Sequence, residues 1–265
     1  MTAWVWNAAA ADFEPTEIEG PLLVADSWLV VNGRSRSLDP HRERFTRSAR
    51  ELGLPVPETD EFWTQLVSLV PFEGEWFPRM EFVAPTGSGD IPAFVFRVRP
   101  APPRKREMKL WIPPFPDPRK SPRIKGPDIP LLNELRQEAV EHGCDDVLLY
   151  DVDGHVLETG TSSLLWWEGD TLCVPDPSLP LLPGTTSARM LTAARTQGLQ
   201  IVHRRIRIPE LSATEVWTVN ALHGIRIVVQ LSDDASATPA SASPSRIRTW
   251  RLQLETERRA QTRSP

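Results

Sequence analysis

Residues 153–158 read Asp-Gly-His-Val-Leu-Glu, and this stretch decides the fold of the second half of the chain. The Asp-Gly pair is typical of a tight turn, and the residues after it favour an extended strand that ends at Glu158. Strands are also predicted on either side, at Val147–Asp151 and Ser163–Trp167, and a Glu-Gly-Asp turn then leads into Thr171–Val174. Short strands joined by tight turns predict a β-rich domain.

Helices are predicted outside these strands. Ile129–His142 has a helical pattern that closes at Gly143, and Ser187–Gln197 has one that closes at Gly198. Three later segments favour strands, at residues 200–206, 216–219 and 225–230. A terminal helix is expected over residues 246–259, after a Ser/Ala/Pro/Asp-rich surface loop over residues 232–245.

The first half of the chain predicts strands around two helices. Leu22–Val31 and Phe94–Arg99 favour extended backbone. A helix is expected to begin at Asp39 as its N-cap, with proline at the next position, and to end before Gly53. A second helix is expected over Asp60–Val70.

Nine prolines lie between residues 100 and 127, which is typical of a connection between domains. We therefore expect a small N-terminal α/β domain (residues 1–112), a Pro-rich connection (residues 113–124) and a larger C-terminal domain (residues 125–265). A cleft between domains is a common place for a small-molecule site.

Composition excludes several classes of partner. The net charge is −5, no basic run is long enough for a nucleic-acid or anionic-membrane surface, and no apolar run is long enough to span a bilayer. We expect a cytoplasmic protein without a nucleic-acid or membrane partner. Cys144 and Cys173 lie in apolar contexts that predict buried thiols, and the five histidines lack the spacing of metal ligands, so no metal is assigned.

Lys125 is the first candidate for chemistry. The chain has 30 Lys and Arg residues but only four lysines, and Lys, unlike Arg, can form a Schiff base. Glu158 follows 33 residues later, and Thr186, in Gly184-Thr185-Thr186, stands 28 residues beyond Glu158. The chain thus offers, in this order, an amine, a carboxylate and a helix start, which are groups that can act together on a cofactor.

Pyridoxal phosphate (PLP) requires a lysine for its aldehyde, an acid that keeps its pyridine nitrogen protonated, and donors for its phosphate. Lys125 fits the first role and can also move protons at the substrate carbon. Glu158 fits the second role. Thr185 and Thr186, at a helix N-terminus, fit the third, and Arg44 can add a charged contact to the phosphate.

Each candidate also has an ordinary structural explanation. Glu158 can be an exposed strand end, Thr185 and Thr186 a helix cap, and Arg44 a solvated residue of an Arg-rich helix. Arg97 and Arg99 are expected on one face of their strand, where a substrate carboxylate or an ion pair would suit them equally.

Six motifs in order carry a resemblance to a known family. They are residues 41–45 (His-Arg-Glu-Arg-Phe), Lys125, residues 143–149, residues 153–158, residues 182–186 (Leu-Pro-Gly-Thr-Thr) and residues 215–222. The chain resembles type IV PLP enzymes, the D-amino-acid and branched-chain aminotransferase-like group that includes aminodeoxychorismate lyase. The resemblance is strong from Lys125 to Val229 and thinner before it.

The resemblance implies a two-domain α/β fold with a β-rich C-terminal pseudobarrel, PLP at the domain interface, and a homodimer. It assigns Lys125 as the Schiff-base lysine and cofactor contacts to Arg44, Glu158, Thr185, Thr186, Asn220 and Ala221. Asn220-Ala221-Leu222 is most similar to the lyase branch, in which this loop lies by the phosphate and substrate. Trp28, Arg97, Arg99 and Leu222 are the candidate substrate contacts.

The chain departs from the family pattern at three places. The N-terminal substrate strand is altered at Ala25–Val31, Ser163 stands where asparagine is expected, and Pro130 stands near the position of a ring-facing tyrosine. These departures concern the substrate more than the cofactor. The resemblance favours 4-amino-4-deoxychorismate lyase, which releases pyruvate and 4-aminobenzoate from a small-molecule amine. An aminotransferase of branched-chain or D-amino acids and a non-catalytic PLP-binding protein remain alternatives.

Overall fold

The computed structural model describes residues 2–36, 38–57, 59–84, 91–233, 237–239 and 244–260. The chain divides into two compact units. The first contains residues 1–103, 124–127 and 254–265, and the second contains residues 104–123 and 128–253. The domain boundaries expected from the sequence stay a prediction.

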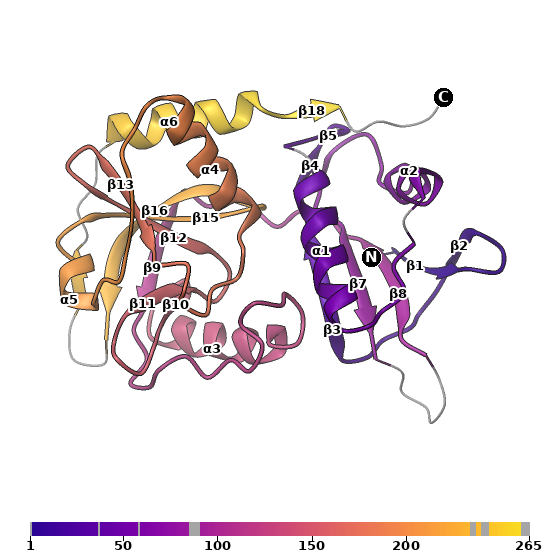
Figure 1. Ribbon diagram of the computed structural model, residues 1–265, viewed down its shortest axis with the longest axis horizontal. Coiled ribbons are helices and arrows are strands. Elements are labelled where there is room, and N and C mark those ends of the chain that lie inside the picture. The colour runs from indigo at the N-terminus through magenta and orange to yellow at the C-terminus, as the bar shows by residue number, and fades with distance from the viewer. Residues whose placement is uncertain are drawn as a thin grey trace. The chain divides into compact units, whose positions relative to one another are not determined.

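The first unit is built on a five-stranded antiparallel sheet with the strand order β2-β1-β8-β7-β3 (Figure 1). Helices α1 and α2 pack against β3 and β2, respectively. A smaller sheet has the order β18-β5-β4-β6. The elements are β1 (Thr2–Asn7), β2 (Asp12–Pro15), β3 (Leu22–Ser27), β4 (Val30–Val31), β5 (Arg34–Ser35), α1 (Asp39–Glu51), α2 (Asp60–Ser68), β6 (Glu75–Trp76), β7 (Arg79–Val83), β8 (Ala93–Val98) and β18 (Arg259–Ala260).

Aromatic side chains fill the core of the first unit. Phe45 of α1 stacks on Phe82 of β7, with ring centroids 5.6 Å apart, and Phe94 of β8 meets both rings edge-on. Each buried Phe contributes about 2–3 kcal/mol of apolar burial. This contact fixes α1, and with it the polar residues of its first turns, on the sheet.

The second unit is built on a sheet with the order β11-β10-β9-β16-β15-β12-β13-β14, with β17 paired to β16. Helices α3 and α4 pack against its strands. The elements are β9 (Glu107–Trp111), α3 (Ile129–Glu141), β10 (Asp146–Tyr150), β11 (Val156–Thr159), β12 (Ser163–Glu168), β13 (Thr171–Pro175), α4 (Thr185–Thr196), β14 (Ile201–Arg204), α5 (Ile208–Leu211), β15 (Glu215–Asn220), β16 (Gly224–Ser232), β17 (Ala237–Pro239) and α6 (Pro244–Thr256).

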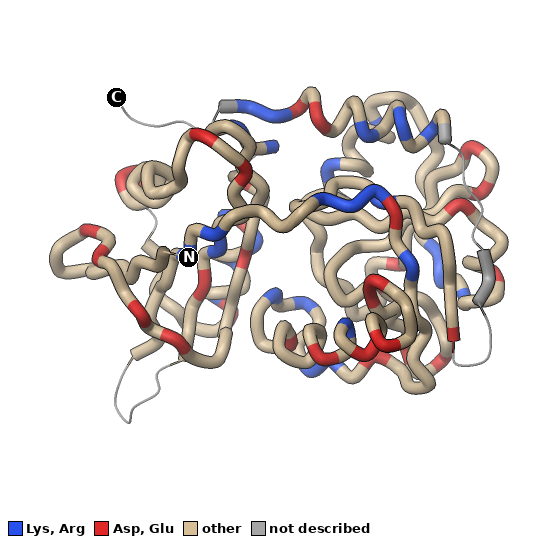
Figure 2. Tube along the Cα trace, turned by 180° about the vertical axis from the view of Figure 1, so that it is seen from behind, with Lys and Arg blue, Asp and Glu red and all other residues tan. Residues whose placement is uncertain are grey.

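Strand β9 lies in a stretch where the sequence indicated no strand. It follows the positive segment 104–106 (Figure 2). It runs parallel to both of its neighbours, β10 and β16. Met108 and Leu110 are fully buried while Glu107 and Lys109 are exposed, so the strand alternates as a half-buried strand should. The Pro-rich region therefore contributes an inner strand of the second sheet.

Several element boundaries differ from those expected. The N-cap of α1 is Leu38, without a side-chain cap, so Asp39 is the first helical residue. Helix α4 begins at Thr185, two residues earlier than predicted, which places both threonines in its first turn. The extended segment 22–31 is broken at residues 28–29, between β3 and β4.

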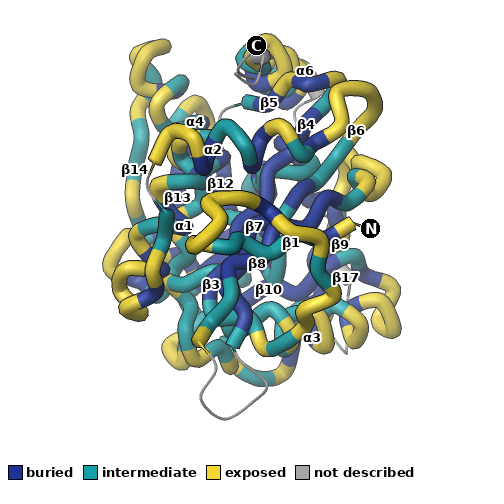
Figure 3. Tube along the Cα trace, turned by 90° about the vertical axis from the view of Figure 1, so that its right-hand side faces the viewer, coloured by how far each residue is buried: buried dark blue, intermediate teal, exposed yellow. Residues whose placement is uncertain are grey.

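Tryptophans anchor helix α6 in the second unit. Trp250 packs against Trp167 of β12 and Trp217 of β15, with centroid distances of 6.1 and 6.3 Å. Figure 3 shows that buried residues concentrate in the strands and exposed ones in the connections. None of the helices in the described ranges is long and apolar enough to cross a membrane.

Candidate functional site

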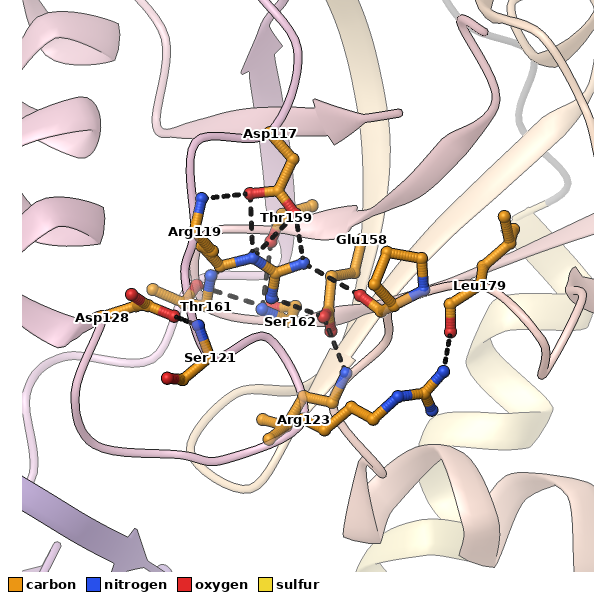
Figure 4. A network of polar contacts seen from close by, with 12 residues as sticks. Asp117, Arg119, Ser121, Arg123, Asp128, Glu158, Thr159, Thr161, Ser162 and Leu179 are labelled. Carbon is orange, nitrogen blue, oxygen red and sulfur yellow. Dashed lines mark hydrogen bonds and ion pairs between the residues drawn. The ribbon is translucent and has the colours of Figure 1, made fainter. Parts of the chain in front are cut away.

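Glu158 is the central polar residue of the second unit. It lies in β11 and is only 4% exposed, so the alternative of an exposed strand end is wrong. Its Oε1 atom accepts two hydrogen bonds, from Arg119 Nη1 at 2.7 Å and from the backbone N–H of Leu182 at 2.8 Å (Figure 4). Its Oε2 atom accepts no hydrogen bond from any residue that the structure describes. One carboxylate oxygen is thus anchored and the other is available to a ligand.

Arg119 reaches Glu158 from the loop after β9. Its Nε and Nη2 atoms donate to both oxygens of Asp117 at 2.8–3.0 Å, and Nη2 also donates to the carbonyl of Pro180 at 3.3 Å. The side chains of all three charged residues are buried, with exposed fractions of 4–8%. Nothing in the sequence distinguished Arg119 from the 25 other arginines, because its partners come from distant segments.

Burial and ion pairing compete at this cluster. Burial raises the pKa of Glu158, and the opposing charge of Arg119 and the Leu182 N–H do not fully cancel the rise. Burial also acts to lower the pKa of Arg119, but Glu158 and Asp117 outweigh it, so that pKa is raised. Arg119 is therefore a permanent cation held beside a carboxylate that gains a proton more readily than usual.

The loop that carries Arg119 is fixed by further polar contacts. The buried carboxylate of Asp128 accepts the N–H groups of Lys120 and Ser121, at 3.1 and 2.8 Å. Arg123 donates to the carbonyls of Ser178 and Leu179 (Figure 4). These bonds give the segment before Lys125 a defined backbone path.

The N-terminus of α4 offers an anion site. Gly184 is the N-cap with extended backbone and has no side chain that could cap the helix, and the first turn holds no acidic residue. Thr186 is buried in that turn. Ser163 of β12 packs against Gly184 so closely that a Cβ atom at position 184 would collide with its Oγ atom. The N–H groups at a helix start whose first turn holds no acidic residue favour a phosphate.

The turn at Asn220 is shaped by its own side chain. Asn220 Oδ1 accepts the N–H of His223 at 2.8 Å, and Nδ2 donates to Ser162 Oγ at 3.1 Å. Arg226, buried beneath the turn, donates to the same Ser162 hydroxyl at 2.8 Å. The Asn220 amide therefore orders the backbone of the turn, including Ala221 and Leu222.

His223 is a neutral imidazole in this turn. Its Nδ1 atom accepts the N–H of Lys105 at 3.0 Å. Burial lowers its pKa to about 3, and four cations add to the effect. These are, in order of their contribution, Arg226, Lys105, Arg136 and Arg104.

In the first unit, Arg44 belongs to a buried triad with Asp26 and His41. Arg44 Nε and Nη2 donate to the two oxygens of Asp26 at 2.7 and 2.8 Å, and His41 Nδ1 lies 2.8 Å from Asp26 Oδ1. Burial acts to raise the Asp26 pKa, but Arg44 and His41 outweigh it and lower it. Burial lowers the pKa of His41, to which the nearby charge of Lys125 also contributes. Arg44 is therefore not a solvated side chain.

The backbone of Lys125, which belongs to the first unit, is bound to β3. Its carbonyl accepts the N–H of Ala25 in β3 at 2.6 Å. Gly126 has a φ of +151°, and a Cβ atom there would lie 2.8 Å from the Cα atom of Val24. Only glycine allows this close approach, which sets the position of the Lys125 backbone.

The candidate substrate residues Arg97 and Arg99 differ in their surroundings. Arg97 is buried and paired with Glu81 at 2.5 Å and Glu19 at 3.0 Å. Arg99 has no ion pair with any described residue; it donates to the carbonyl of Phe77 and, at 3.3 Å, to Ser27 Oγ. Burial lowers the pKa of Arg99 to about 10, with a smaller contribution from Arg79, so it remains a cation at neutral pH.

Trp28, a candidate substrate contact from the sequence, is buried. Its ring is 1% exposed and lies against Phe96, with centroids 6.0 Å apart. It is a core residue of the first unit. Both cysteines, Cys144 and Cys173, are buried free thiols, as predicted.

One group of possible metal ligands occurs in the described chain, at Asp151, Asp153 and His155, whose ligand atoms lie within 4.8 Å of one another. The Asp151 oxygens already accept the N–H groups of Asp153 and His155 and face His155 Nδ1 at 3.1 Å. These bonds close the turn before β11, and we assign no metal to it.

Comparison with known proteins supports the same family from sequence and from fold. A bifunctional aminodeoxychorismate lyase / D-amino acid transaminase of Mycobacterium tuberculosis is 25% identical over 226 residues, which cover 75% of this chain and 78% of that protein. A hypothetical aminotransferase from M. tuberculosis, solved with α-ketoglutarate and PMP, has a TM-score of 0.80 at 20% identity, covering 97% of this chain and 98% of that one. A branched-chain aminotransferase from Thermoproteus uzoniensis has a TM-score of 0.79 at 18% identity, covering 97% and 93%.

The solved structures confirm the predicted two-domain α/β fold of the D-amino-acid aminotransferase type. The family model for amino-transferase class IV matches residues 23–231, which is most of the chain. The predicted family is thereby confirmed, and the chain belongs to the class IV aminotransferases, a family of PLP-dependent enzymes.

Proposed function

We infer that this chain binds PLP through Lys125, Glu158 and the start of α4, and that it uses the cofactor as a lyase. The cofactor assignment depends on the burial and hydrogen bonding of the Glu158 carboxylate. A buried carboxylate with one anchored oxygen and one open oxygen is what a protonated ring nitrogen needs as a partner.

The other two requirements of PLP also have suitable residues. The first turn of α4, with Thr185 and Thr186 and no acidic residue, suits a phosphate. Asn220 orders a second turn whose backbone at Ala221 could serve the same group. Arg44, although bound to Asp26, adds a positive charge in the first unit. We propose all of these residues as cofactor contacts.

Bound PLP supplies an aldehyde that joins covalently to amines and a ring that accepts electrons. Lys125 would hold the aldehyde between turnovers and, once the substrate amine has taken its place, carry a proton from the carbon that bears that amine. Glu158 would keep the ring nitrogen protonated. Arg99, a cation that pairs with no carboxylate among the described residues, is a better candidate than Arg97 for the substrate carboxylate.

For the reaction, we propose conversion of 4-amino-4-deoxychorismate to 4-aminobenzoate and pyruvate. Loss of the proton to Lys125 is followed by cleavage of the C–O bond to the enolpyruvyl group, which takes up a proton to become pyruvate, so no other reactant is consumed. The name of the M. tuberculosis relative, which pairs this activity with D-amino acid transamination, supports both this proposal and the alternative of a transaminase. We further propose a cytoplasmic homodimer.

A visible spectrum of the purified protein tests the cofactor assignment. The wild type should show an absorption band that borohydride removes while it fixes the cofactor covalently to the chain. Lys125→Ala should lack this band, and Lys120→Ala should keep it. Lys120 is a matched control because its contact with Asp128 is made by the backbone. Retention of the borohydride-sensitive band in Lys125→Ala would sink the assignment.

Product analysis separates the two reactions. The lyase releases pyruvate from 4-amino-4-deoxychorismate without a second substrate. If turnover instead requires a 2-oxo acid as amino acceptor, the lyase proposal is wrong and the transaminase is correct. If the coloured protein turns over no amine of either class, it is a non-catalytic PLP binder.

A further inference from the structure

We propose that Arg119 is a positioning residue that keeps the Glu158 carboxylate ionised and thereby places a proton on the ring nitrogen of PLP. The inference rests on the proposed function, because it assigns a role to Arg119 within the same cofactor site. Arg119 itself is not expected to touch the cofactor, since its contacts are with Asp117, Glu158 and a carbonyl.

The geometry of Arg119 leaves it little freedom. Asp117 binds the Nε and Nη2 side of the guanidinium through both carboxylate oxygens, and the carbonyl of Pro180 holds Nη2 as well. Because the guanidinium is planar, fixing one side fixes the direction of Nη1. That direction ends at Glu158 Oε1, at 2.7 Å. Glu158 is therefore held by a donor that cannot rotate away.

The charges of the cluster point to a cationic ligand. Asp117 and Glu158 carry two negative charges and Arg119 carries one positive charge, all with side chains 4–8% exposed. One negative charge of the cluster is thus left without a positive partner inside it. A buried charge of this kind favours a cation, and the open Oε2 atom of Glu158 is where the cation can bind. A protonated pyridine nitrogen has the required charge and a single N–H donor.

Arg119 decides which partner keeps the shared proton. A ring nitrogen bound at Oε2 would share one proton with the carboxylate, and that proton could reside on either partner. A fixed guanidinium at Oε1 lowers the affinity of the carboxylate for that proton, because the charged form is stabilised more by an adjacent cation. Without Arg119, burial would move the proton to Glu158 and leave the ring nitrogen neutral.

The experiment uses PLP labelled with ¹⁵N in its ring, because the nitrogen chemical shift reports its protonation directly, independently of turnover. Wild-type protein loaded with the labelled cofactor should show a protonated nitrogen at neutral pH. Arg119→Gln should shift the signal toward the unprotonated value, weaken PLP binding about tenfold, and regain the protonated signal only at lower pH. Glu158→Gln should give the unprotonated value throughout.

Two further variants make the result specific. Arg123→Gln removes an arginine of the same loop whose hydrogen bonds within the described ranges all go to carbonyls, and it should leave the ring-nitrogen signal unchanged. Arg119→Lys keeps the charge but cannot bind Asp117 and Glu158 in the same fork, and it should lie between the wild type and Arg119→Gln. If Arg119→Gln does not fold, the Arg119→Lys comparison decides the question.

The outcomes separate this inference from the proposed function. A wild-type protein that binds no PLP, or binds it with a neutral nitrogen that Glu158→Gln does not alter, overturns both. A protonated nitrogen that depends on Glu158 but is unchanged in every Arg119 variant overturns only the role of Arg119.

Discussion

Neutral His223 is a single residue that makes stability depend on pH. Its folded-state pKa of about 3 lies below the ordinary value of 6.5, so between these values the unfolded chain binds a proton that the folded chain does not. Stability contributed by neutral His223 is therefore present above pH 6.5 and is lost as the pH falls toward 3.

We expect the free energy of unfolding to change less steeply with pH near pH 5 in His223→Gln than in the wild type. The difference in slope should correspond to the uptake of up to one proton on unfolding. Urea unfolding at a series of pH values measures this slope. His203→Gln, at an exposed position, is the control and should leave the slope unchanged. An identical slope for the wild type and His223→Gln would show that the imidazole is protonated in the folded protein.

Gly126, next to the candidate catalytic Lys125, lies where a side chain would strain the backbone. Gly126→Ala should cost about 2–4 kcal/mol, because the methyl group meets the Val24 backbone at 2.8 Å and φ is positive. The control is Gly143→Ala, which has a φ of +72° but open space around its Cβ atom, and should cost only about 1 kcal/mol. Urea unfolding of both variants gives the comparison, and equal costs would mean that the contact with β3 relaxes.

At the scale of elements, the start of α4 packs against β12 through two small residues, Gly184 and Ser163. Gly184→Ala should cost about 1–3 kcal/mol because its methyl group would collide with Ser163 Oγ. Ser163→Ala should be nearly neutral alone and should restore most of the stability of Gly184→Ala. The four proteins form a double-mutant cycle measured by denaturant unfolding. Additive effects would contradict the contact.

The helices were the most predictable elements. Gly53, Gly143 and Gly198 follow helical patterns and end α1, α3 and α4 close to where the sequence placed them. Strand β9 was missed because its alternation covers only five residues among prolines and because its partner strands come much later in the chain. Local signals determine helix ends, whereas an inner strand of a sheet depends on distant pairing.

The residues of the candidate site also differ in whether local sequence or distant contacts reveal them. Lys125, Glu158 and Thr186 could be proposed from the sequence because each lies in a short motif. Arg119 could not, since its importance comes from a tertiary contact with a strand 39 residues later. The sequence also could not show that Arg97 is paired and Trp28 buried, because both depend on side chains from other strands.

At the scale of the molecule, a substitution in α6 tests how much this helix contributes to the stability of the second unit. Trp250→Ala should lower the free energy of unfolding by about 3–5 kcal/mol, because a buried ring is lost from a cluster of three tryptophans. Leu252→Ala is the control; its side chain is 64% exposed, and the change should be within about 0.5 kcal/mol.

Hydrogen exchange locates the effect of Trp250→Ala. Amides of β12 and β15, which carry Trp167 and Trp217, should lose protection more than amides of the first unit. Unchanged protection in β12 and β15 would mean that α6 adds nothing to the stability of the sheet.

The position of β9 also governs how the chain folds as it leaves the ribosome. Glu107 of β9 pairs with Ile227 of β16, 120 residues further along the chain. At ordinary rates of synthesis, β9 is made roughly 6–24 s before this partner emerges. The prolines that flank it lack N–H groups, so they limit the length over which the waiting strand can pair with another nascent chain. We expect the Pro-rich surroundings to limit misassembly of this half-buried strand during translation.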